Sequence, residues 1–299
     1  MDLGFLGFPN LSTQQFQNQR NIPGDPGEML LDADTKRRVA VWLTNSKRPL
    51  WIYGPTGCGK TMLAEWIAHK TGRGLIRFSG HGGIEIEDLI GHLTLVDGEV
   101  VHQDGPVTTA MKEGSMLVLD EGDLIHPDVW TSLHAVLEGN PLVINKGGVT
   151  TIQPRPGFQI IVTANSKGNG ENRDSYRGTK EMNQATLNRF TRLRMDYMPE
   201  PVELGIVKAK ASPKMRGIAD RFIQAANKIR ESHIKGELSR GISTRDIIAW
   251  MATTKLFVET GLGPHDALIE ALGTVWADGL DDDEAVAAKN LAILAFPEN

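Results

Sequence analysis

The apolar residues of positions 1–200 fall into short continuous runs that are separated by polar stretches. A run that is apolar at every position and has the length of one strand predicts a strand buried on both faces. Such strands are typical of a parallel sheet covered by helices, which predicts an α/β fold. The runs are residues 49–53, 74–78, 115–121 and 158–165, and a mixed segment at 193–197 is expected to be the last strand.

Beyond residue 200 the apolar positions have helical spacing instead. Helices are expected at 214–233 and 243–260, and Pro264 and Asp281 are each expected to begin another. Within the first part, helices are expected at 32–46, from Met62 after the first strand, and at 127–137.

These patterns predict three parts. Residues 1–30 are rich in Gln, Asn, Gly and Pro, and we expect an irregular arm there. Residues 31–200 are expected to form an α/β nucleotide-binding domain, and residues 201–299 a small helical domain. Pro199-Glu200-Pro201 marks the boundary.

Two segments of the α/β part predict β-hairpins. Alternating residues at 93–96 and 99–101 flank Asp97-Gly98, a sequence that favours a tight turn between strands. Residues 142–145 and 149–152 are joined through Lys146-Gly147-Gly148 and have the same pattern.

The first buried run leads into Gly54-Pro55-Thr56-Gly57-Cys58-Gly59-Lys60-Thr61, which matches the phosphate-binding pattern G-x-x-x-x-G-K-[ST] at every fixed position. Glycines let the backbone N–H groups surround phosphate oxygens, and the following helix directs its positive end at them. Lys60 is predicted to reach the β- and γ-phosphates, and the Thr61 hydroxyl to bind Mg²⁺. The chain is therefore predicted to bind a nucleoside triphosphate.

Polar side chains end two other buried runs. Asp120 is predicted to face Mg²⁺ from across the sheet, and Glu121 to polarise the attacking water. Asp123 is a lesser candidate for either role. Asn165 ends the next run and is predicted to orient water against the γ-phosphate, although a single Asn after a strand is often only a turn residue.

Composition narrows the class of protein. The chain has 299 residues, 23% charged residues and a net charge of −5, so no basic field points to nucleic acid. It has no apolar run of about 18 residues and no signal-peptide pattern, and Cys58 is its single cysteine. We expect a cytoplasmic protein without disulfides or a zinc cluster.

Together these residues resemble the AAA+ ATPases, and within them the MoxR branch. The shared features are the phosphate loop, Leu117–Glu121, Thr163–Asn165, Leu187–Phe190 and Ser243–Arg245. Within the branch the chain is most similar to CobS, the ATPase subunit of aerobic cobaltochelatase, and CbbQ is a near neighbour. That likeness rests on Asp88–Gly91, Asp104–Pro106, Arg177–Thr179 and Asn183–Phe190.

The resemblance implies an AAA+ core with a parallel sheet followed by a helical lid, assembled as a ring, commonly a hexamer. It implies that Asn165 is the sensor-1 residue and that Arg189 reaches the γ-phosphate of the neighbouring subunit, with Arg192 and Arg194 as alternatives. Arg245 would be the sensor-2 residue. The alternative interpretation is that Arg245 forms only a surface ion pair. The two hairpins would line the pore of the ring or face a partner.

Relatives of this kind usually act with a protein that carries a von Willebrand A domain. The Asp-x-Ser-x-Ser metal site of that domain is missing here, so this partner is expected on a separate chain. The predicted function is ATP hydrolysis that remodels or activates a partner protein. The alternatives are a small-molecule kinase with the same loop, a nucleotide-gated scaffold and a nucleic-acid translocase.

Overall fold

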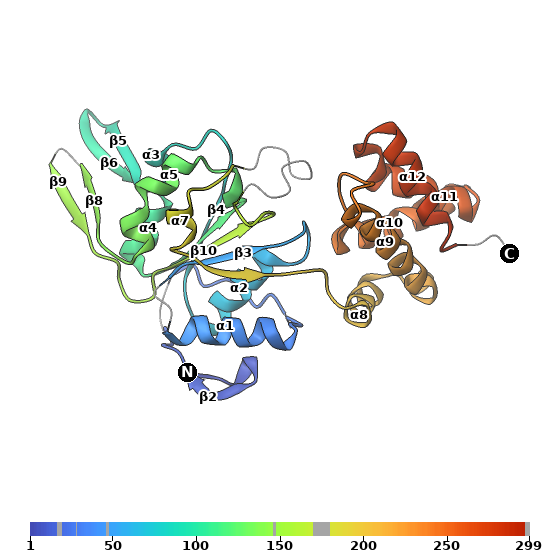
Figure 1. Ribbon diagram of the computed structural model, residues 1–299, viewed down its shortest axis with the longest axis horizontal. Helices are drawn as coiled ribbons and strands as arrows, with labels where there is room; N and C mark the ends of the chain where they lie inside the picture. Colours follow the sequence, from blue (N-terminus) through green and yellow to red (C-terminus); the bar gives the residue numbers. More distant parts are fainter. Residues whose placement is uncertain (17–19, 28, 46–47, 146–147, 170–179, 297–299) are drawn as a thin grey trace. The chain divides into compact units, whose positions relative to one another are not determined.

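The computed structural model describes residues 1–16, 20–27, 29–45, 48–145, 148–169 and 180–296. The contacts between Cα atoms divide the chain into two units (Figure 1). The first unit comprises residues 1–54 and 59–195, and the second comprises residues 55–58 and 196–299. Arg177-Gly178-Thr179, one of the CobS-like motifs, lies outside the described residues.

The first unit is built on a five-stranded parallel sheet with the strand order β11-β3-β10-β7-β4. All five residues of β7 are buried, as the continuous apolar run predicts. The α/β fold and the four apolar strands are thereby confirmed. The strands are β3 (Leu50–Tyr53), β4 (Leu75–Ser79), β7 (Met116–Asp120), β10 (Gln159–Ala164) and β11 (Thr191–Arg194).

The last strand begins and ends earlier than predicted. Thr191 pairs with Leu50 and Arg194 with Tyr53, so the pairing covers only the length of β3. The Met195 N–H still bonds the Tyr53 carbonyl at 2.8 Å, but β3 ends at Tyr53, so the last residues of the expected segment 193–197 have no residue of β3 opposite them.

The main helices of this unit are α1 (Ala33–Asn45), α2 (Lys60–Thr71) and α4 (Pro106–Glu113), and α3 (Ile86–Ile90) and α7 (Gln184–Leu187) are short. The helix predicted at 127–137 is two helices, α5 (Pro127–Ser132) and α6 (His134–Leu137). They separate because the Leu133 N–H bonds the Trp130 carbonyl three residues back, which tightens the turn and ends the α-helical ladder.

The N-terminal segment is more regular than the arm expected at 1–30. β1 (Asp2–Leu3) and β2 (Phe8–Ser12) pair antiparallel around a 3₁₀ turn, Gly4–Leu6. The apolar residues of this hairpin supply the reason, because Leu3 and Leu6 are fully buried and the Phe5 ring lies edge-on to Trp66, 5.2 Å between centroids. The segment therefore packs on the first unit.

Both predicted hairpin segments form antiparallel pairs. β5 (Gly91–Val96) pairs with β6 (Glu99–Asp104), and β8 (Leu142–Asn145) with β9 (Val149–Ile152). Figure 1 shows both hairpins extending from the same end of the first unit. Apolar side chains stay exposed on them, at Leu93, Leu95, Val96, Val100, Val101, Val143 and Val149.

A cluster of aromatic rings fills the core beside β3. Trp51 lies edge-on to Trp130 and to Phe190, with centroid distances of 5.9 and 5.2 Å, and Trp130 also contacts Phe190 at 5.6 Å. Each such pair adds about 0.5–1.5 kcal/mol beyond the burial of its area. The cluster fixes β3, which leads into the phosphate loop.

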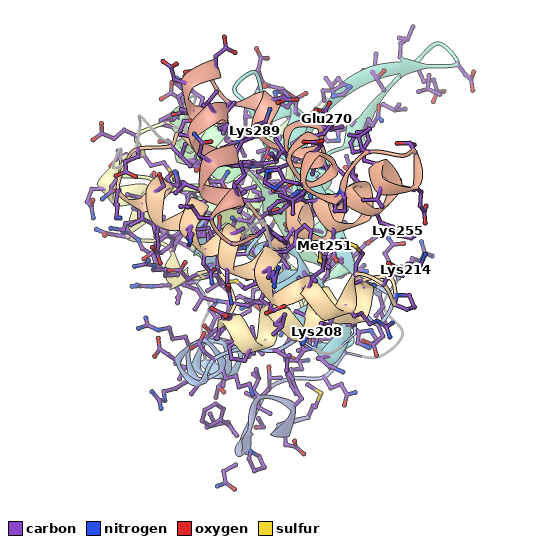
Figure 2. The ribbon with its side chains drawn as sticks, turned by 90° about the vertical axis from the view of Figure 1, so that its right-hand side faces the viewer. Lys208, Lys214, Met251, Lys255, Glu270 and Lys289 are labelled. Carbon is purple, nitrogen blue, oxygen red and sulfur yellow. The ribbon has the colours of Figure 1, made fainter. Side chains whose placement is uncertain are left out.

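The second unit is helical, with a core around Phe222, Trp250 and Phe296. Its first helix was not predicted, because Pro199 and Pro201 indicate an interruption, yet Pro201 lies in the first turn, where no N–H is needed. Figure 2 shows Lys208, Lys214 and Lys255 around Met251 on one face of this unit. The helices are α8 (Glu200–Lys210), α9 (Ala219–Ile234), α10 (Thr244–Glu259), α11 (Pro264–Val275) and α12 (Asp282–Ile293).

Candidate nucleotide site

The predicted phosphate loop follows β3 and ends in α2. Gly54 is joined to the neighbouring strand β10 by a hydrogen bond from its N–H to the Ala164 carbonyl, 3.3 Å. Gly57 and Gly59 have φ angles of 77° and 93°, which side chains rarely tolerate. These backbone angles explain why glycine is favoured at both positions. Residues Pro55–Cys58 of the loop, which are also predicted to bind phosphate, belong to the second unit.

Lys60 begins α2 and is buried. Its Nζ donates to the Gly54 carbonyl at 2.8 Å and to Asn165 Oδ1 at 3.0 Å. The structure therefore brings together the predicted phosphate lysine and the predicted sensor, which are 105 positions apart. Hydrogen bonds from an ammonium to phosphate oxygens are charge-assisted, so this is the side chain expected to bind an anion here.

Asp120 ends β7 at the centre of a polar cluster. Its Oδ1 accepts hydrogen bonds from Thr61 Oγ1 at 2.8 Å and from Thr163 Oγ1 at 2.6 Å. Its Oδ2 accepts from Arg77 Nε, and Arg77 Nη1 also lies 3.5 Å from Glu65 Oε1. Thr61 and Asp120 thus lie together, as their predicted metal role requires. Arg77 carried no sequence signal for joining them, and Thr163 was named only as part of the shared feature Thr163–Asn165.

Glu121 has a backbone conformation that few residues with a side chain adopt, φ 55° and ψ 38°. The chain is closely packed on both sides of this residue. A Cβ at Gly80 would lie 2.7 Å from the Glu121 carbonyl oxygen, and a Cβ at Gly122 would lie 2.3 Å from Val162 Cγ1. The Glu121 side chain is exposed. Left-handed residues cost about 1–3 kcal/mol and cluster at functional sites.

Asp123, the lesser sequence candidate, has a different place. It is buried, and its Oδ2 accepts from the N–H groups of Asn165 and Ser166 at 3.0 and 2.9 Å and from Ser166 Oγ at 2.9 Å. Burial raises the pKa of Asp123, and the bonds from Ser166 and Asn165 oppose that shift. Asp123 therefore holds the backbone that carries Asn165.

Arg189 forms its bonds outside the cluster around Lys60 and Asp120. Its Nη2 lies 2.7 Å from Glu138 Oε1, its Nε donates to the same oxygen at 2.9 Å, and its Nη1 donates to the Ala185 carbonyl at 2.7 Å. His134, on the helix before Glu138, has a pKa lowered by burial and then by the charge of Arg189. Arg192 and Arg194 lie on β11, and Arg245 is exposed in the first turn of α10. The predicted contacts of Arg189 and Arg245 with a nucleotide stay predictions.

Comparisons with known proteins agree with this geometry. A family described as AAA domain (dynein-related subfamily) matches residues 49–190, which hold the loop, β7 and β10. A second, described as CbbQ/NirQ/NorQ C-terminal, matches residues 203–292. The chain belongs to the AAA+ ATPases.

Relatives of this AAA+ ATPase cover most of its length. NorQ of Paracoccus denitrificans is 31% identical over 75% of this chain and 80% of NorQ. CobS of a Sinorhizobium species is 28% identical over 79% of this chain and 74% of CobS, and CbbQ of Hydrogenophilus thermoluteolus is 30% identical over 78% and 83%. The resemblance to the MoxR branch is thereby confirmed.

Among solved structures, NtrX from Brucella abortus shares the fold, with a TM-score of 0.53 and 16% identity over 90% of this chain and 62% of NtrX. The family makes this AAA+ ATPase a nucleotide-binding enzyme that hydrolyses ATP. In the parts of the chain that the structure describes, no helix is long and apolar enough to cross a bilayer.

Proposed function

We propose that this AAA+ ATPase hydrolyses Mg²⁺-ATP at the interfaces of a homo-oligomeric ring, a hexamer, and uses the energy to remodel or activate a partner protein. ATP hydrolysis is supported by two hydrogen-bonded pairs, Lys60 with Asn165 and Thr61 with Asp120. Four residue types needed for ATP hydrolysis meet at the carboxyl edge of one sheet.

The residues fit a magnesium ion. The side chains of Thr61 and Asp120 are hydrogen-bonded to each other, so their oxygens lie close together. Oxygen atoms are the ligands that Mg²⁺ prefers. Among the described residues no group of three or more His, Cys, Asp and Glu could hold a metal by itself, which suits an ion that is completed by phosphate oxygens and water. The ion would neutralise charge on the phosphates.

Binding and hydrolysis are then divided among the chain's own groups. Lys60 and the N–H groups of Gly54–Thr61 bind the phosphates, and Glu121 polarises the attacking water. Asn165 orients that water against the γ-phosphate. The hydrogen bond from Lys60 to Asn165 supports this division. A γ-phosphate that binds Lys60 would compete with that bond, so phosphate binding and the position of the Asn165 side chain would be coupled.

The ring completes the site. Arg189 bonds Glu138 and Ala185, and no bond joins it to the described residues of its own nucleotide cluster. This supports a role toward the nucleotide of a neighbouring subunit, a contribution worth about 10³–10⁵ in rate in related chemistry. Arg245 would report the nucleotide state to the lid.

The two hairpins support action on a protein. Leu95 and Val100 on the first hairpin are 69% and 66% exposed, and Val149 on the second is 83% exposed. Exposed apolar side chains gathered on projecting hairpins are typical of surfaces that contact another polypeptide. The partner would include a von Willebrand A-domain protein on a separate chain, and the acidic net charge of −5 disfavours nucleic acid.

The decisive experiment is the ATPase rate against protein concentration for the wild type, Arg189→Ala, Glu121→Gln and a mixture of the two variants. We expect a specific activity that rises with concentration, is lost in each variant and partly returns in the mixture, since a mixed interface restores one intact site. Glu121→Gln should still bind ATP, which a fluorescent ATP analogue measures.

Activity that is independent of concentration and unchanged in Arg189→Ala would contradict the shared site. Phosphate transfer to an added acceptor in place of water would favour a small-molecule kinase. A Leu95→Asp, Val100→Asp variant serves as the control for the hairpins, because it should keep the basal ATPase rate and lose stimulation by a partner.

A further inference from the structure

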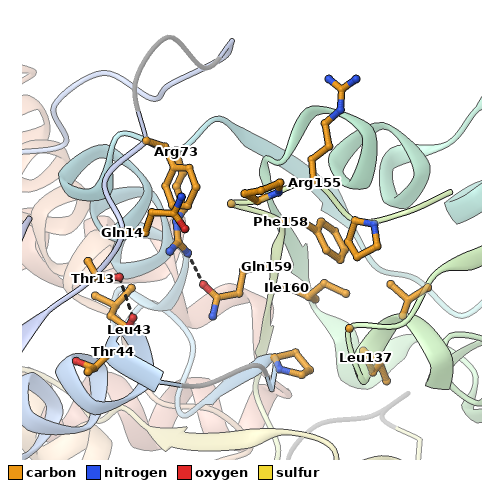
Figure 3. A pocket seen from close by; sticks show the side chains of 17 residues that line it. Thr13, Gln14, Leu43, Thr44, Arg73, Leu137, Arg155, Phe158, Gln159 and Ile160 are labelled. Atoms are coloured by element: carbon orange, nitrogen blue, oxygen red, sulfur yellow. Dashed lines mark hydrogen bonds between the residues drawn. The ribbon is translucent and has the colours of Figure 1, made fainter.

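A second pocket lies at the opposite edge of the sheet from the nucleotide residues. It has a volume of about 540 Å³ and is lined by the segment after β2, the end of α1 and the residues that precede β3, β4 and β10 (Figure 3). Parallel strands place their amino ends at one edge, whereas Asp120 and Asn165 follow the carboxyl ends. The pocket is therefore separate from the ATP site.

One wall of this pocket holds a buried arginine. Arg73 is 5% exposed and stands two residues before β4. Its Nη1 donates to Gln159 Oε1, and its Cζ lies 4.8 Å from the centroid of the Phe16 ring. Its Nε is buried and has no hydrogen-bond partner among the described residues. Figure 3 shows the guanidinium between Gln14 and Gln159.

The charges around this guanidinium are unbalanced. Arg73 and Arg155 both line the pocket, and no aspartate or glutamate of the described residues lines it. Burial lowers the pKa of Arg73 to about 10, so the side chain still carries its charge at neutral pH. A buried charge without an opposite partner is costly, and a bound anion removes that cost.

One side of the pocket is apolar, although polar groups supply the larger share of the lining as a whole. Phe158, Ile160 and Leu137 line the side of the pocket that faces away from Arg73 in Figure 3. Pockets of about 300–1,000 Å³ with apolar walls and one or two charged groups are typical of sites for small molecules. The planar guanidinium of Arg73, whose Nε–H has no partner among the described residues, matches the planar geometry of a carboxylate.

We propose that this pocket binds a small organic anion that carries a carboxylate on an apolar body. The carboxylate pairs with Arg73, and the apolar part packs against Phe158, Ile160 and Leu137. The site is independent of ATP hydrolysis, because its residues belong to the amino edge of the sheet and share none of the nucleotide contacts.

The test uses 3-phenylpropionate as the probe and the alcohol 3-phenylpropan-1-ol as its uncharged counterpart, with binding to the full chain measured by titration calorimetry. We expect the wild type to bind the acid and to discriminate against the alcohol by roughly tenfold to a hundredfold, the range for a charge-assisted pair. Inorganic phosphate, tested alongside, is expected to bind more weakly because it has no apolar part.

Gln159→Glu is the informative variant, since it places a carboxylate of the same size against Arg73. It should abolish binding of 3-phenylpropionate while raising the thermal stability of the free protein. Lys60→Ala, at the other edge of the sheet, should bind the acid as the wild type does.

Three results would overturn the proposal: no binding of the acid to the wild type, equal binding of the alcohol, or undiminished binding in Gln159→Glu. Each result would mean that Arg73 has only a structural role, through its contacts with Phe16 and Gln159.

Discussion

Thr61 Oγ1 and Asp120 Oδ1 share a hydrogen bond of 2.8 Å although they are 59 positions apart. The bond joins the end of the phosphate loop to the end of β7. Thr163 Oγ1 donates to the same Asp120 oxygen at 2.6 Å, so the carboxylate is held from two strands and one helix.

The Thr61–Asp120 contact predicts the metal dependence of hydrolysis. Asp120→Asn should raise the Mg²⁺ concentration for half-maximal ATPase activity by about tenfold to a hundredfold, the usual effect of losing a group that orients a metal ligand. The measurement is the ATPase rate against Mg²⁺ at saturating ATP. Thr163→Val is the matched control, because it removes a bond to the same oxygen and leaves both proposed ligands in place. An unchanged Mg²⁺ dependence in Asp120→Asn would argue against the assignment.

The Arg189–Glu138 pair predicts which arginine acts between subunits. Arg189→Ala should lower kcat by about 10³ or more, and Arg189→Lys should not restore it, because an ammonium lacks the planar fork of a guanidinium. Glu138→Gln keeps Arg189 and should retain much of the rate. Arg192→Ala is the comparison variant, and a larger loss there than in Arg189→Ala would transfer the role to Arg192.

Asp123 predicts a pH dependence of stability. Burial raises its pKa in the folded protein above the ordinary 3.8, so the folded state binds the proton more tightly than the unfolded state. The stabilisation that this proton gives is complete below pH 3.8 and is lost as the pH rises through the folded pKa. The free energy of unfolding of the wild type should therefore fall, relative to Asp123→Asn, as the pH rises from 3.8. Urea titrations across that range measure it, and parallel curves for the two proteins would refute the prediction.

The helical unit contains a buried ion pair with a large predicted effect on stability. Arg230 donates from Nη1 and Nη2 to the two oxygens of Glu203, both at 2.7 Å, and Thr244 Oγ1 donates to Glu203 Oε1 at 2.6 Å. Glu203→Gln leaves the buried Arg230 charge unpaired and should cost about 3–5 kcal/mol in the free energy of unfolding. Chemical denaturation measures this, with the exposed pair Lys289–Asp278 as the control, where Asp278→Asn should change little.

The sequence predicted those parts of the site that lie at fixed spacing or at strand ends. Lys60 and Thr61 follow from the loop pattern, and Asp120 and Asn165 follow because parallel strands end at one edge. The contact of Arg77 with Asp120 could not be foreseen, because it depends on β4 lying beside β7, a neighbour relation that no local pattern encodes.

Burial explains the remaining differences. Asp123 looked like a second catalytic carboxylate, but the turn at Glu121 directs it to the backbone of Asn165 and Ser166. Arg73 gave no signal, since a charge beside a strand is usually solvated, and its partner Gln159 is 86 positions away. The helix α8 was missed because Pro199 and Pro201 indicate an interruption, whereas Pro201 stands in its first turn.

The aromatic cluster beside β3 also gives the protein an internal optical probe. Trp51 stands three residues before Gly54, its ring contacts Phe190, the residue after Arg189, and its Nε1 donates to the Ser166 carbonyl at 3.2 Å. Its emission is therefore sensitive to movement of the phosphate loop, of the Asn165 strand end and of the Arg189 segment. Nucleotide binding and subunit assembly can be followed by tryptophan fluorescence on the unlabelled chain.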